Sequence, residues 1–371
     1  MTTVIGEVDE LNISSESICE FYAQHWQRKI ALTVPAFYRW QFTESPFHAG
    51  VDHCVVAIDD VSRELLGVMG INKRPFFLDG QMRNGAELTT WIVNPQHAGA
   101  GIGTRIIRAI QPKYDVIIGM GASPMALPIY MRHGFRFLRA IPRYVKVFNF
   151  DAVEKFARYD SRARDLVNQW SQLGNVQFSA QAANNEFLHL LEPVLHSKFN
   201  HFTRAPEYLD WRFSRHPLLK YRQFKVHAPG CAQSRGAYVC LKEEFGIDGL
   251  RLVHVMDCFG DDKDLPAAVG FIHNYCAEND IHLADFFCTT THITCHFAAS
   301  GWFSTSDDAS FQFPHLFHPL EFREPPTTSL VYWSNSSPPG LSDTARLYIT
   351  KQDVDLDRPT QAAHEVLHVT Q

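Results

Sequence analysis

The chain has no long apolar run, no secretion signal and no paired cysteine motif. No stretch approaches the ~20 apolar residues that a membrane-spanning helix needs, and residues 1–17 are acidic and contain no apolar core of a signal peptide. The eight cysteines include no C-x-x-C pair, and most have apolar neighbours, as reduced core thiols do. We therefore expect a cytoplasmic protein with no disulfide scaffold, no metal site and no membrane partner.

Positive charge is also not in excess, because 34 basic residues stand against 40 acidic ones and the net charge is −6. Nonspecific nucleic-acid binding depends on many phosphate-neutralising cations, so we expect no nucleic-acid partner. Hydrophobic residues make up 45% of the 371 residues, which is enough to bury a full core in each half. The length is that of two typical domains.

Two segments of the chain share the pattern H-x9-P-x4-W-x-F-x3-P. They are residues 25–46 and 196–217, and their matched positions are His25/His196, Pro35/Pro206, Trp40/Trp211, Phe42/Phe213 and Pro46/Pro217. Five matches at one constant offset, including tryptophan and proline, indicate an internal repeat. The sequence therefore predicts two successive copies of one fold.

The coarse secondary structure has the same order in both halves. In the first half we expect helices at 16–30, 35–42, 101–111 and 124–135, and strands at 53–58, 65–73, 86–95, 115–121 and 143–150. In the second half we expect helices at 184–200, 206–214, 265–279 and 291–303, and strands at 221–226, 237–245, 250–259 and 282–288. Residues 151–185, rich in charge and in Gln and Asn, are the expected connector.

Residues 91–104 read WIVNPQHAGAGIGT, in which a strand ends at Pro95 and three glycines lead into a helix. Glycines let backbone N–H groups approach an anion without interference from Cβ, and a helix N-terminus adds partial positive charge. A P-loop would need Gly-Lys-Ser/Thr where this chain has Gly103-Thr104-Arg105. A dinucleotide-binding turn would need G-x-G-x-x-G, and residue 104 is threonine. We interpret the turn as an anion site of another kind, and a merely tight connection between strand and helix is the alternative.

The turn resembles motif A of the GNAT (GCN5-related) acyltransferase superfamily, Q/R-x-x-G-x-G/A. Gln96, Gly99 and Gly101 match this motif position for position. After the next expected strand, the sequence from Ser123 to Phe135 resembles motif B of the same family, N-x-x-A-x-x-x-Y-x-x-x-G-F. Serine stands where asparagine is common, which weakens the transfer of that residue's role. The two motifs occur in the expected order, and the resemblance covers roughly residues 10–150.

In that family the pyrophosphate of coenzyme A rests on the motif A turn, and the pantetheine arm pairs with the backbone of the preceding strand. The resemblance therefore implies acyl-CoA, carrying an acetyl or another short acyl group, as the co-substrate. The residues that it assigns to coenzyme A are Trp91, Ile92, Val93, Gln96, His97, Ala98, Gly99, Ala100, Gly101, Ile102, Gly103, Thr104, Ser123 and Ala126.

Acyl transfer from a thioester to an amine needs a neutral amine, a donor for the oxyanion and a proton for the thiolate leaving group. Tyr130 matches the family tyrosine whose hydroxyl points at the thioester sulfur, which implies a general acid. Glu87 opens the strand before motif A, where many members of the family carry a glutamate, and is our candidate base or water-relay carboxylate. An ordinary solvated acid is the alternative interpretation of Glu87. Strand alternation predicts one shared face for Glu87, Thr89, Trp91 and Val93.

The second half has no glycine-rich turn at the corresponding place. Residues 257–264 instead contain four aspartates, which would repel a pyrophosphate. We therefore expect the C-terminal copy to have lost coenzyme A binding and to supply a wall of the acceptor site, because ligands often bind between domains. The candidate acceptor contacts at that end are His254, Asp257, Trp302 and Phe303.

These observations predict an α/β fold with two tandem GNAT-like domains. Each would contain a mixed, mostly antiparallel sheet flanked by helices, and the second would be degenerate. We expect a catalytic domain at residues 1–165, a degenerate domain at 166–355 and a C-terminal tail at 356–371.

The resemblance implies an acyl-CoA-dependent N-acyltransferase that acts on a small-molecule primary amine. The whole-chain layout also resembles bacterial sugar-nucleotide N-acyltransferases, so the amino group of a dTDP-linked amino-deoxyhexose is the narrower expectation. One alternative is tRNA-dependent aminoacyl transfer of the peptidoglycan-bridge type, which the net charge of −6 disfavours. A second alternative is a non-catalytic acyl-CoA-binding protein, and the presence of Tyr130 argues against it.

Overall fold

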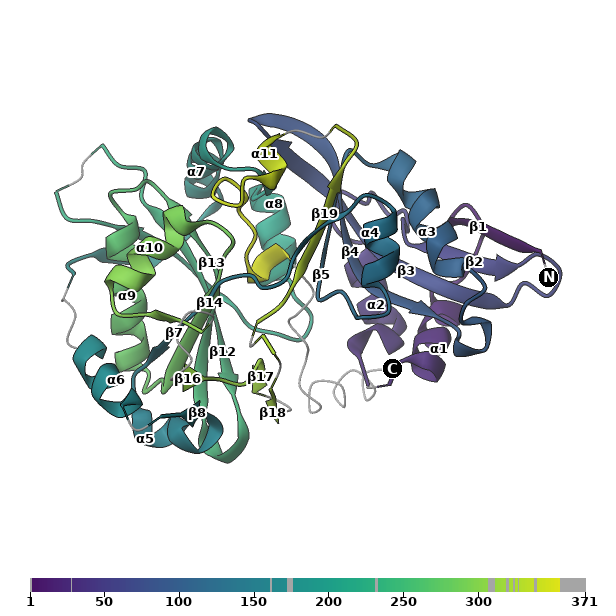
Figure 1. The fold of residues 1–371 in the computed structure, drawn as a ribbon. Coiled ribbons are helices and arrows are strands. Elements are labelled where there is room, and N and C mark those ends of the chain that lie inside the picture. Colours follow the sequence, from purple (N-terminus) through teal and green to yellow (C-terminus); the bar gives the residue numbers. More distant parts are fainter. Residues whose placement is uncertain are drawn as a thin grey trace.

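The structure is a computed structural model in which two sheets flanked by helices lie side by side (Figure 1). It describes residues 2–27, 29–160, 162–171, 176–230, 233–305, 311–317, 320–322, 324–325, 327–336 and 339–353. The expected tail at 356–371 lies outside these residues. Within the described ranges, every helix is too short or too polar to cross a lipid bilayer.

The first sheet has the strand order β1-β2-β3-β4-β5-β19-β6, and β10 pairs with β3. Among its described strands only β4 and β5 run parallel, so the sheet is mixed and mostly antiparallel, as predicted. The strands are β1 (Thr3–Glu7), β2 (Val55–Asp59), β3 (Leu65–Leu78), β4 (Gln81–Val93), β5 (Val116–Met120), β6 (Arg136–Leu138), β10 (His201–Phe202) and β19 (Leu330–Ser334).

Helices cover both faces of the first sheet. One hydrophobic cluster joins one face to α1 (Ser15–His25) and α2 (Pro35–Phe42), and another joins the opposite face to α3 (Ile102–Ile110) and α4 (Leu127–Arg132). The helix α3 forms because its four isoleucines recur at helical spacing and are all buried on one side. The motif A turn and the motif B helix therefore lie on the same face of the sheet.

The second sheet repeats this arrangement with the order β15-β7-β14-β13-β12-β11-β9. Its parallel pair among the described strands is β13 with β14, which corresponds to β4 with β5. The strands are β7 (Arg143–Val147), β9 (Ser179–Ala182), β11 (Arg222–His227), β12 (Ala237–Phe245), β13 (Arg251–Gly260), β14 (Leu283–Phe287) and β15 (Phe303–Ser304). The helices of this half are α7 (Asn185–Lys198), α8 (Pro206–Leu209), a π-helical turn (Asp210–Ser214), α9 (Leu265–Glu278) and α10 (Thr291–Ala299).

The two halves exchange one strand each, which the sequence analysis did not predict. The strand β19 from the end of the chain lies between β5 and β6 in the first sheet, whereas β7 from the first half lies between β14 and β15 in the second. Figure 1 shows β19 beside β5 and β7 beside β14. A boundary at residue 165 therefore divides the chain but does not separate the two sheets.

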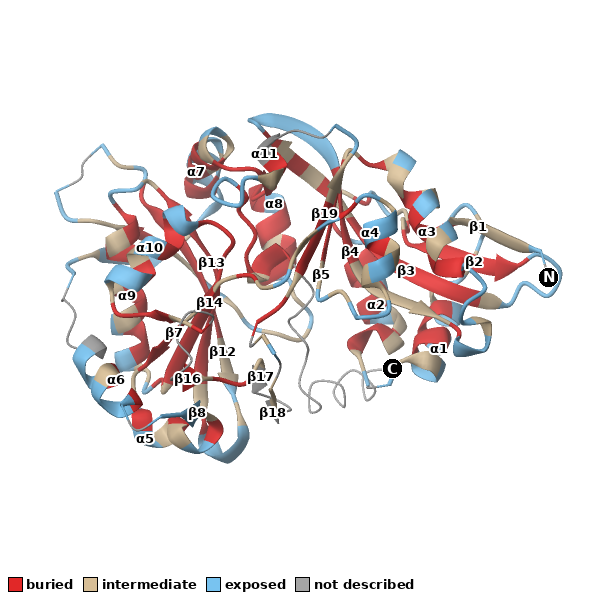
Figure 2. Cartoon of the chain, in the orientation of Figure 1, coloured by how far each residue is buried: buried red, intermediate tan, exposed pale blue. Residues whose placement is uncertain are grey.

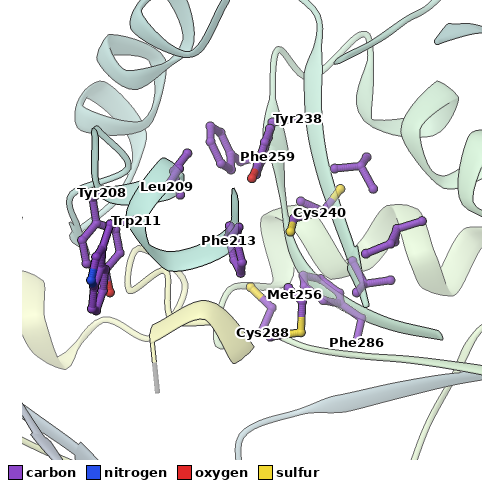
Figure 3. Close-up of a cluster of buried hydrophobic side chains, with 14 of the residues drawn as sticks. Tyr208, Leu209, Trp211, Phe213, Tyr238, Cys240, Met256, Phe259, Phe286 and Cys288 are labelled. Carbon is purple, nitrogen blue, oxygen red and sulfur yellow. The ribbon is translucent and has the colours of Figure 1, made fainter. Parts of the chain in front are cut away.

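The two copies of the repeated motif meet at the contact between the halves. The rings of Trp40 and Trp211 stack with centroids 4.8 Å apart, and the Trp211 indole donates to the Trp40 carbonyl over 3.2 Å. Buried residues follow the strands of both sheets and α8 between them (Figure 2). Figure 3 shows Phe213 in the same buried cluster as Met256 of β13 and Cys288, which follows β14. The repeated tryptophans thus pack the two copies on each other.

The expected connector is partly helical. It contains α5 (Phe150–Val153), a 3-10 turn (Glu154–Phe156), β8 (Arg158–Tyr159) and α6 (Ala163–Ser171). The remaining short elements are β16 (Phe311–Gln312), β17 (Leu316–Phe317), β18 (Leu320–Glu321), α11 (Pro339–Ser342) and the 3-10 turns Ala31–Thr33, Pro95–His97, Gln111–Lys113, Ile247–Gly249 and Lys351–Asp353.

Candidate active site

The strands β4 and β5 part at Thr89. Their parallel ladder joins only residues 85–88 to residues 116–119, and β19 pairs with residues 116–120 along the opposite edge of β5. Residues 85–88 are buried, whereas residues 89–93 are half-buried. Beyond Leu88, one edge of β4 therefore has no strand beside it within the described part of the chain.

The backbone of Trp91 and Val93 faces this opening. The Asn94 amide donates to the Leu66 carbonyl of β3 over 2.8 Å, and Ile92 lies opposite Val68 in the same register. In an antiparallel pair, residues facing the partner strand alternate with residues facing away from it. The alternation directs the backbone groups of Ile92 toward β3 and those of its two neighbours toward the parting. Of the three residues assigned to the pantetheine arm, Trp91 and Val93 are the ones in position to pair with it.

A bulge in β4 separates the side chains of Glu87, Thr89, Trp91 and Val93, which were predicted to share one face. The register with β3 shifts between Met69 and Ile71, so that β4 has one extra residue between Leu88 and Trp91. Glu87 consequently contacts Arg74 on the side of α1 and α2, whereas Trp91 and Val93 pack in the cluster of α3 and α4. The prediction that all four side chains share one face is wrong, because alternation holds only in an unbroken ladder.

Tyr130 lies on the α3 and α4 side with Trp91. The centroids of the two rings are 5.3 Å apart, and Phe135 packs at 4.9 Å on the tyrosine ring. Tyr130 is 4% exposed, and this burial raises the pKa of its hydroxyl above the usual value of about 10. The hydroxyl therefore keeps its proton through neutral pH and can act as a hydrogen-bond donor.

The motif A turn presents unused backbone donors. Gly99 and Gly101 have φ values of 84° and 76°, in the left-handed region that glycine adopts freely, and nothing lies within 4 Å of the position of a Cβ on either. Gly101 is the N-cap of α3, and among the described residues no side chain caps the helix, so its first amides are available to a ligand. This arrangement can bind an anion through the amides of residues 101–104.

Gly103 allows α3 to approach β4 closely. A Cβ at this position would lie 2.7 Å from a ring carbon of Trp91 and 3.2 Å from the Ile129 methyl group. We expect Gly103→Ala to lower the free energy of unfolding by about 1–3 kcal/mol, because the overpacked helix must move. Urea unfolding measures this change. The matched Arg108→Ala, on the exposed side of the same helix, should change it by less than about 0.5 kcal/mol; equal stability of the two variants would contradict the packing described here.

Charge at the turn provides a test of anion binding. Aspartate and asparagine tolerate the left-handed backbone of Gly101 better than other residues, so Gly101→Asp and Gly101→Asn carry similar strain. We expect the aspartate variant to bind acetyl-CoA about tenfold more weakly than the asparagine variant, because its carboxylate repels the pyrophosphate. Calorimetric dissociation constants at low and high salt measure this ratio, which should shrink as salt screens the charge. Identical affinities at low salt would exclude the turn as the pyrophosphate site.

The motif B residues begin α4. The Ser123 hydroxyl accepts from the Ala126 amide over 3.1 Å, and the Ala126 carbonyl accepts from the Tyr130 amide over 3.2 Å. The serine thus stabilises the turn before α4 and retains its proton for another acceptor. His97 is half-buried in the 3-10 turn after β4, where its carbonyl accepts from Ala100 over 3.2 Å. The Gln96 amide donates to the Asn94 side chain over 3.0 Å, which fixes the entry to the turn.

Glu87 is buried rather than solvated. One of its carboxylate oxygens lies 3.3 Å from an Arg74 nitrogen and accepts from the Asn72 amide over 3.3 Å. The Asn72 oxygen and the Thr89 hydroxyl are buried close by, and neither has a hydrogen-bond partner among the described residues. Glu87 is therefore oriented by two donors in a region that has unused acceptors.

The corresponding turn of the second half is acidic, as expected. Asp262 binds Lys198 over 2.6 Å and His292 over 2.8 Å, and buried Asp264 accepts from the Ala228 amide over 2.8 Å. These contacts tie the loop to its own surroundings. Carboxylates in place of glycines disfavour a pyrophosphate at this position.

The parting of β13 and β14 is filled by residues 346–353. The Tyr348 hydroxyl donates to the Cys258 carbonyl over 2.9 Å and also contacts the Asp257 carboxylate, and Thr350 bridges to Cys288. The segment lies where the first half leaves its strands open. This filling supports the expectation that the second half does not bind coenzyme A.

The four residues expected to contact an acceptor are all buried. Asp257 pairs with Arg204 over 2.9 Å, His254 lies 2.5 Å from Asp285, and the Trp302 indole donates to His273 over 2.7 Å. Phe303 stacks on Phe311 at 4.9 Å in a separate cluster. The structure does not bring these four side chains together.

The sequence analysis missed Arg74, Asn72 and Asp353. Arg74 and Asn72 lie two residues apart in a strand of otherwise apolar character, so inward-facing polar residues were the available signal. Asp353 had no local signal, because its contacts are far away in the sequence.

Comparisons with known proteins agree with this geometry. Residues 15–119 match the model of the acetyltransferase (GNAT) family. No curated protein matches the chain. Among solved structures, a GCN5-related N-acetyltransferase from Anabaena variabilis aligns with a TM-score of 0.56 and 11% identity, over 89% of this chain and 72% of that one. A GCN5-related N-acetyltransferase from Kribbella flavida aligns with a TM-score of 0.54 and 12% identity, over 91% and 72%.

The likeness extends to a further class of acyltransferase. N-myristoyltransferase from Saccharomyces cerevisiae, solved with bound myristoyl-CoA, aligns with a TM-score of 0.54 and 11% identity, over 95% of this chain and 84% of that one. At such identities the structures show a common fold. The prediction of a fold of two tandem GNAT-like units is confirmed, and residues 15–119 match the acetyltransferase (GNAT) family model.

Proposed function

We propose that the protein transfers an acyl group from coenzyme A to a primary amine by direct attack. The observation that carries this proposal is the opening beside β4, which adjoins the uncapped motif A turn and has Tyr130 on one face of the strand and Glu87 on the other. A thioester in the opening would have its sulfur on the tyrosine side and would receive the amine on the glutamate side. Acid and base would thus act on opposite sides of the reacting carbonyl.

The residues present supply a base for the amine and an acid for the leaving group. Glu87 accepts the proton that the amine loses as the C–N bond forms, and Tyr130 donates a hydrogen bond to the thiolate as the C–S bond breaks. The Asn72 oxygen and the Thr89 hydroxyl, which have no partner among the described residues, can accept a hydrogen bond from the amine. No covalent intermediate on the protein is needed.

The acceptor class and the compartment are finer parts of the proposal. The order of an active unit followed by a degenerate one supports the amino sugar of a dTDP-linked sugar nucleotide as the acceptor. The described cysteines are all free thiols, six of them buried, which fits a reducing cytoplasm. We propose the first unit as the catalytic domain and the second as the support that holds residues 346–353.

The proposal is tested by thermal shift with acetyl-CoA, followed by release of free thiol in the presence of primary amines. The panel should include an amino sugar nucleotide, a simple amino sugar, a polyamine and a peptide with a free N-terminus. We expect stabilisation by acetyl-CoA and thiol release with one class of amine. Absence of stabilisation would exclude both an acyl-CoA-dependent transferase and a non-catalytic acyl-CoA-binding protein. Stabilisation without turnover on any amine would favour the non-catalytic protein.

A further inference from the structure

A chain of buried ionic contacts joins Glu87 to the other half of the protein. The same Arg74 nitrogen that contacts Glu87 also donates to the Asp353 carboxylate and carbonyl, both over 3.2 Å. A second Arg74 nitrogen donates to the Tyr208 hydroxyl over 2.5 Å. Asp353 in turn accepts two bonds of 2.7 Å from Arg204. Arg74 is therefore shared between a carboxylate of the first half and one of the C-terminal segment.

The contacts of residues 346–353 fix the place of Asp353. The Thr350 amide donates to the Asp353 carboxylate over 2.9 Å, and the Tyr348 amide donates to the Asn200 carbonyl over 2.9 Å. Arg204 also binds Asp257, which the Tyr348 hydroxyl contacts. The aspartate thus reaches Arg74 from a segment that is seated in the parted strands of the second half.

The buried ionic network contains fewer cationic than carboxylic groups. Arg74 and Arg204 are two buried cations, whereas Glu87, Asp257 and Asp353 are three buried carboxylic groups. Each cation lies between two carboxylates. The negative charge of Asp353 therefore partly offsets the positive charge of Arg74 that acts on Glu87. The charged and titratable groups around Glu87 are Arg74 on β3, Tyr208 on α8 and Asp353, with Arg204, Arg212 and Asp257 beyond them.

We propose that Asp353 is a positioning residue for the acyl transfer: it holds one side of the Arg74 guanidinium and so sets the orientation and basicity of Glu87. This inference rests on the proposed function, in which Glu87 is the base. It gives the degenerate half a task in the chemistry, since that half seats the segment that carries Asp353.

The test is Asp353→Asn. Without the second carboxylate, the charge of Arg74 acts on Glu87 alone and favours its ionised form, so the acid limb of the kcat profile should move to lower pH by about one unit. A weaker base accepts the amine proton less readily, so kcat should fall about tenfold while the affinity for acetyl-CoA holds. Both are measured with acetyl-CoA and the best amine of the panel. Arg346→Gln, which removes an exposed pair with Asp79 in the same segment, is the control and should change neither quantity.

A second variant keeps the inference testable if the asparagine variant does not fold. Asp353→Glu retains the charge, so it should keep the acid limb within a few tenths of a pH unit of wild type. A lowered melting temperature with an unmoved acid limb in Asp353→Asn would overturn the positioning role, as would a glutamate variant with the shifted limb. A wild-type protein that binds no acetyl-CoA would overturn the proposed function and the inference with it. If the wild-type protein is active and Asp353→Asn has the same kcat, the inference is overturned but the proposed function is not.

Discussion

Glu87→Gln should lower kcat on the order of 10²-fold while leaving the affinity for acetyl-CoA within about twofold. Glutamine keeps the size of the side chain and an oxygen for Arg74 and Asn72, but it cannot accept a proton. The acid limb of the pH profile should vanish with the base. Steady-state kinetics of thiol release across pH measure both effects.

The control for this variant is Glu64→Gln, which changes an exposed acid at the turn between β2 and β3. It should leave kcat and its pH profile unaltered, since surface substitutions away from such a site have small effects. If Glu87→Gln retained full turnover with an unaltered acid limb, Glu87 would be a structural partner of Arg74 and the base would be elsewhere.

Tyr130→Phe should also lower kcat on the order of 10²-fold, because the thiolate would leave without a proton donor. Burial raises the pKa of this tyrosine, so the wild-type profile should show no basic limb from Tyr130 below about pH 10. The affinity for acetyl-CoA should hold, because the ring and its contacts with Trp91 and Phe135 remain. Pre-steady-state measurement of the first turnover separates this loss from slow product release.

Tyr114→Phe is a matched control for the loss of a tyrosine hydroxyl. Tyr114 is as buried as Tyr130 and belongs to the same hydrophobic cluster, but it precedes β5 rather than lying on α4. It should retain kcat within about twofold. Comparable losses in the two variants would indicate a packing effect and would remove the acid role of Tyr130.

The sequence predicted the features that local patterns carry. The spacing of Gln96, Gly99 and Gly101 after a strand identified the turn, and the motif from Ser123 to Phe135 identified the helix of Tyr130. The tryptophan and proline of each repeat revealed the two copies, and the two tryptophans stack on each other.

The strand exchange and the bulge could not be predicted in the same way. The strands β7 and β19 are both five residues long, and the choice of sheet depends on pairing between segments that lie far apart in the chain. Alternation assumed an unbroken ladder through residues 88–91, so it placed Trp91 on the wrong face. The pairing of Arg74 with Asp353 likewise spans 279 positions, and no local pattern reports it.

The central claim is that outward-pointing amides at the start of α3 hold the pyrophosphate of an acyl-CoA beside the open edge of β4. Titration of the wild-type protein with acetyl-CoA in a calorimeter tests it most directly. The account predicts saturable heat with one site per chain, because the second half is filled by residues 346–353. Absence of heat at millimolar acetyl-CoA would contradict it.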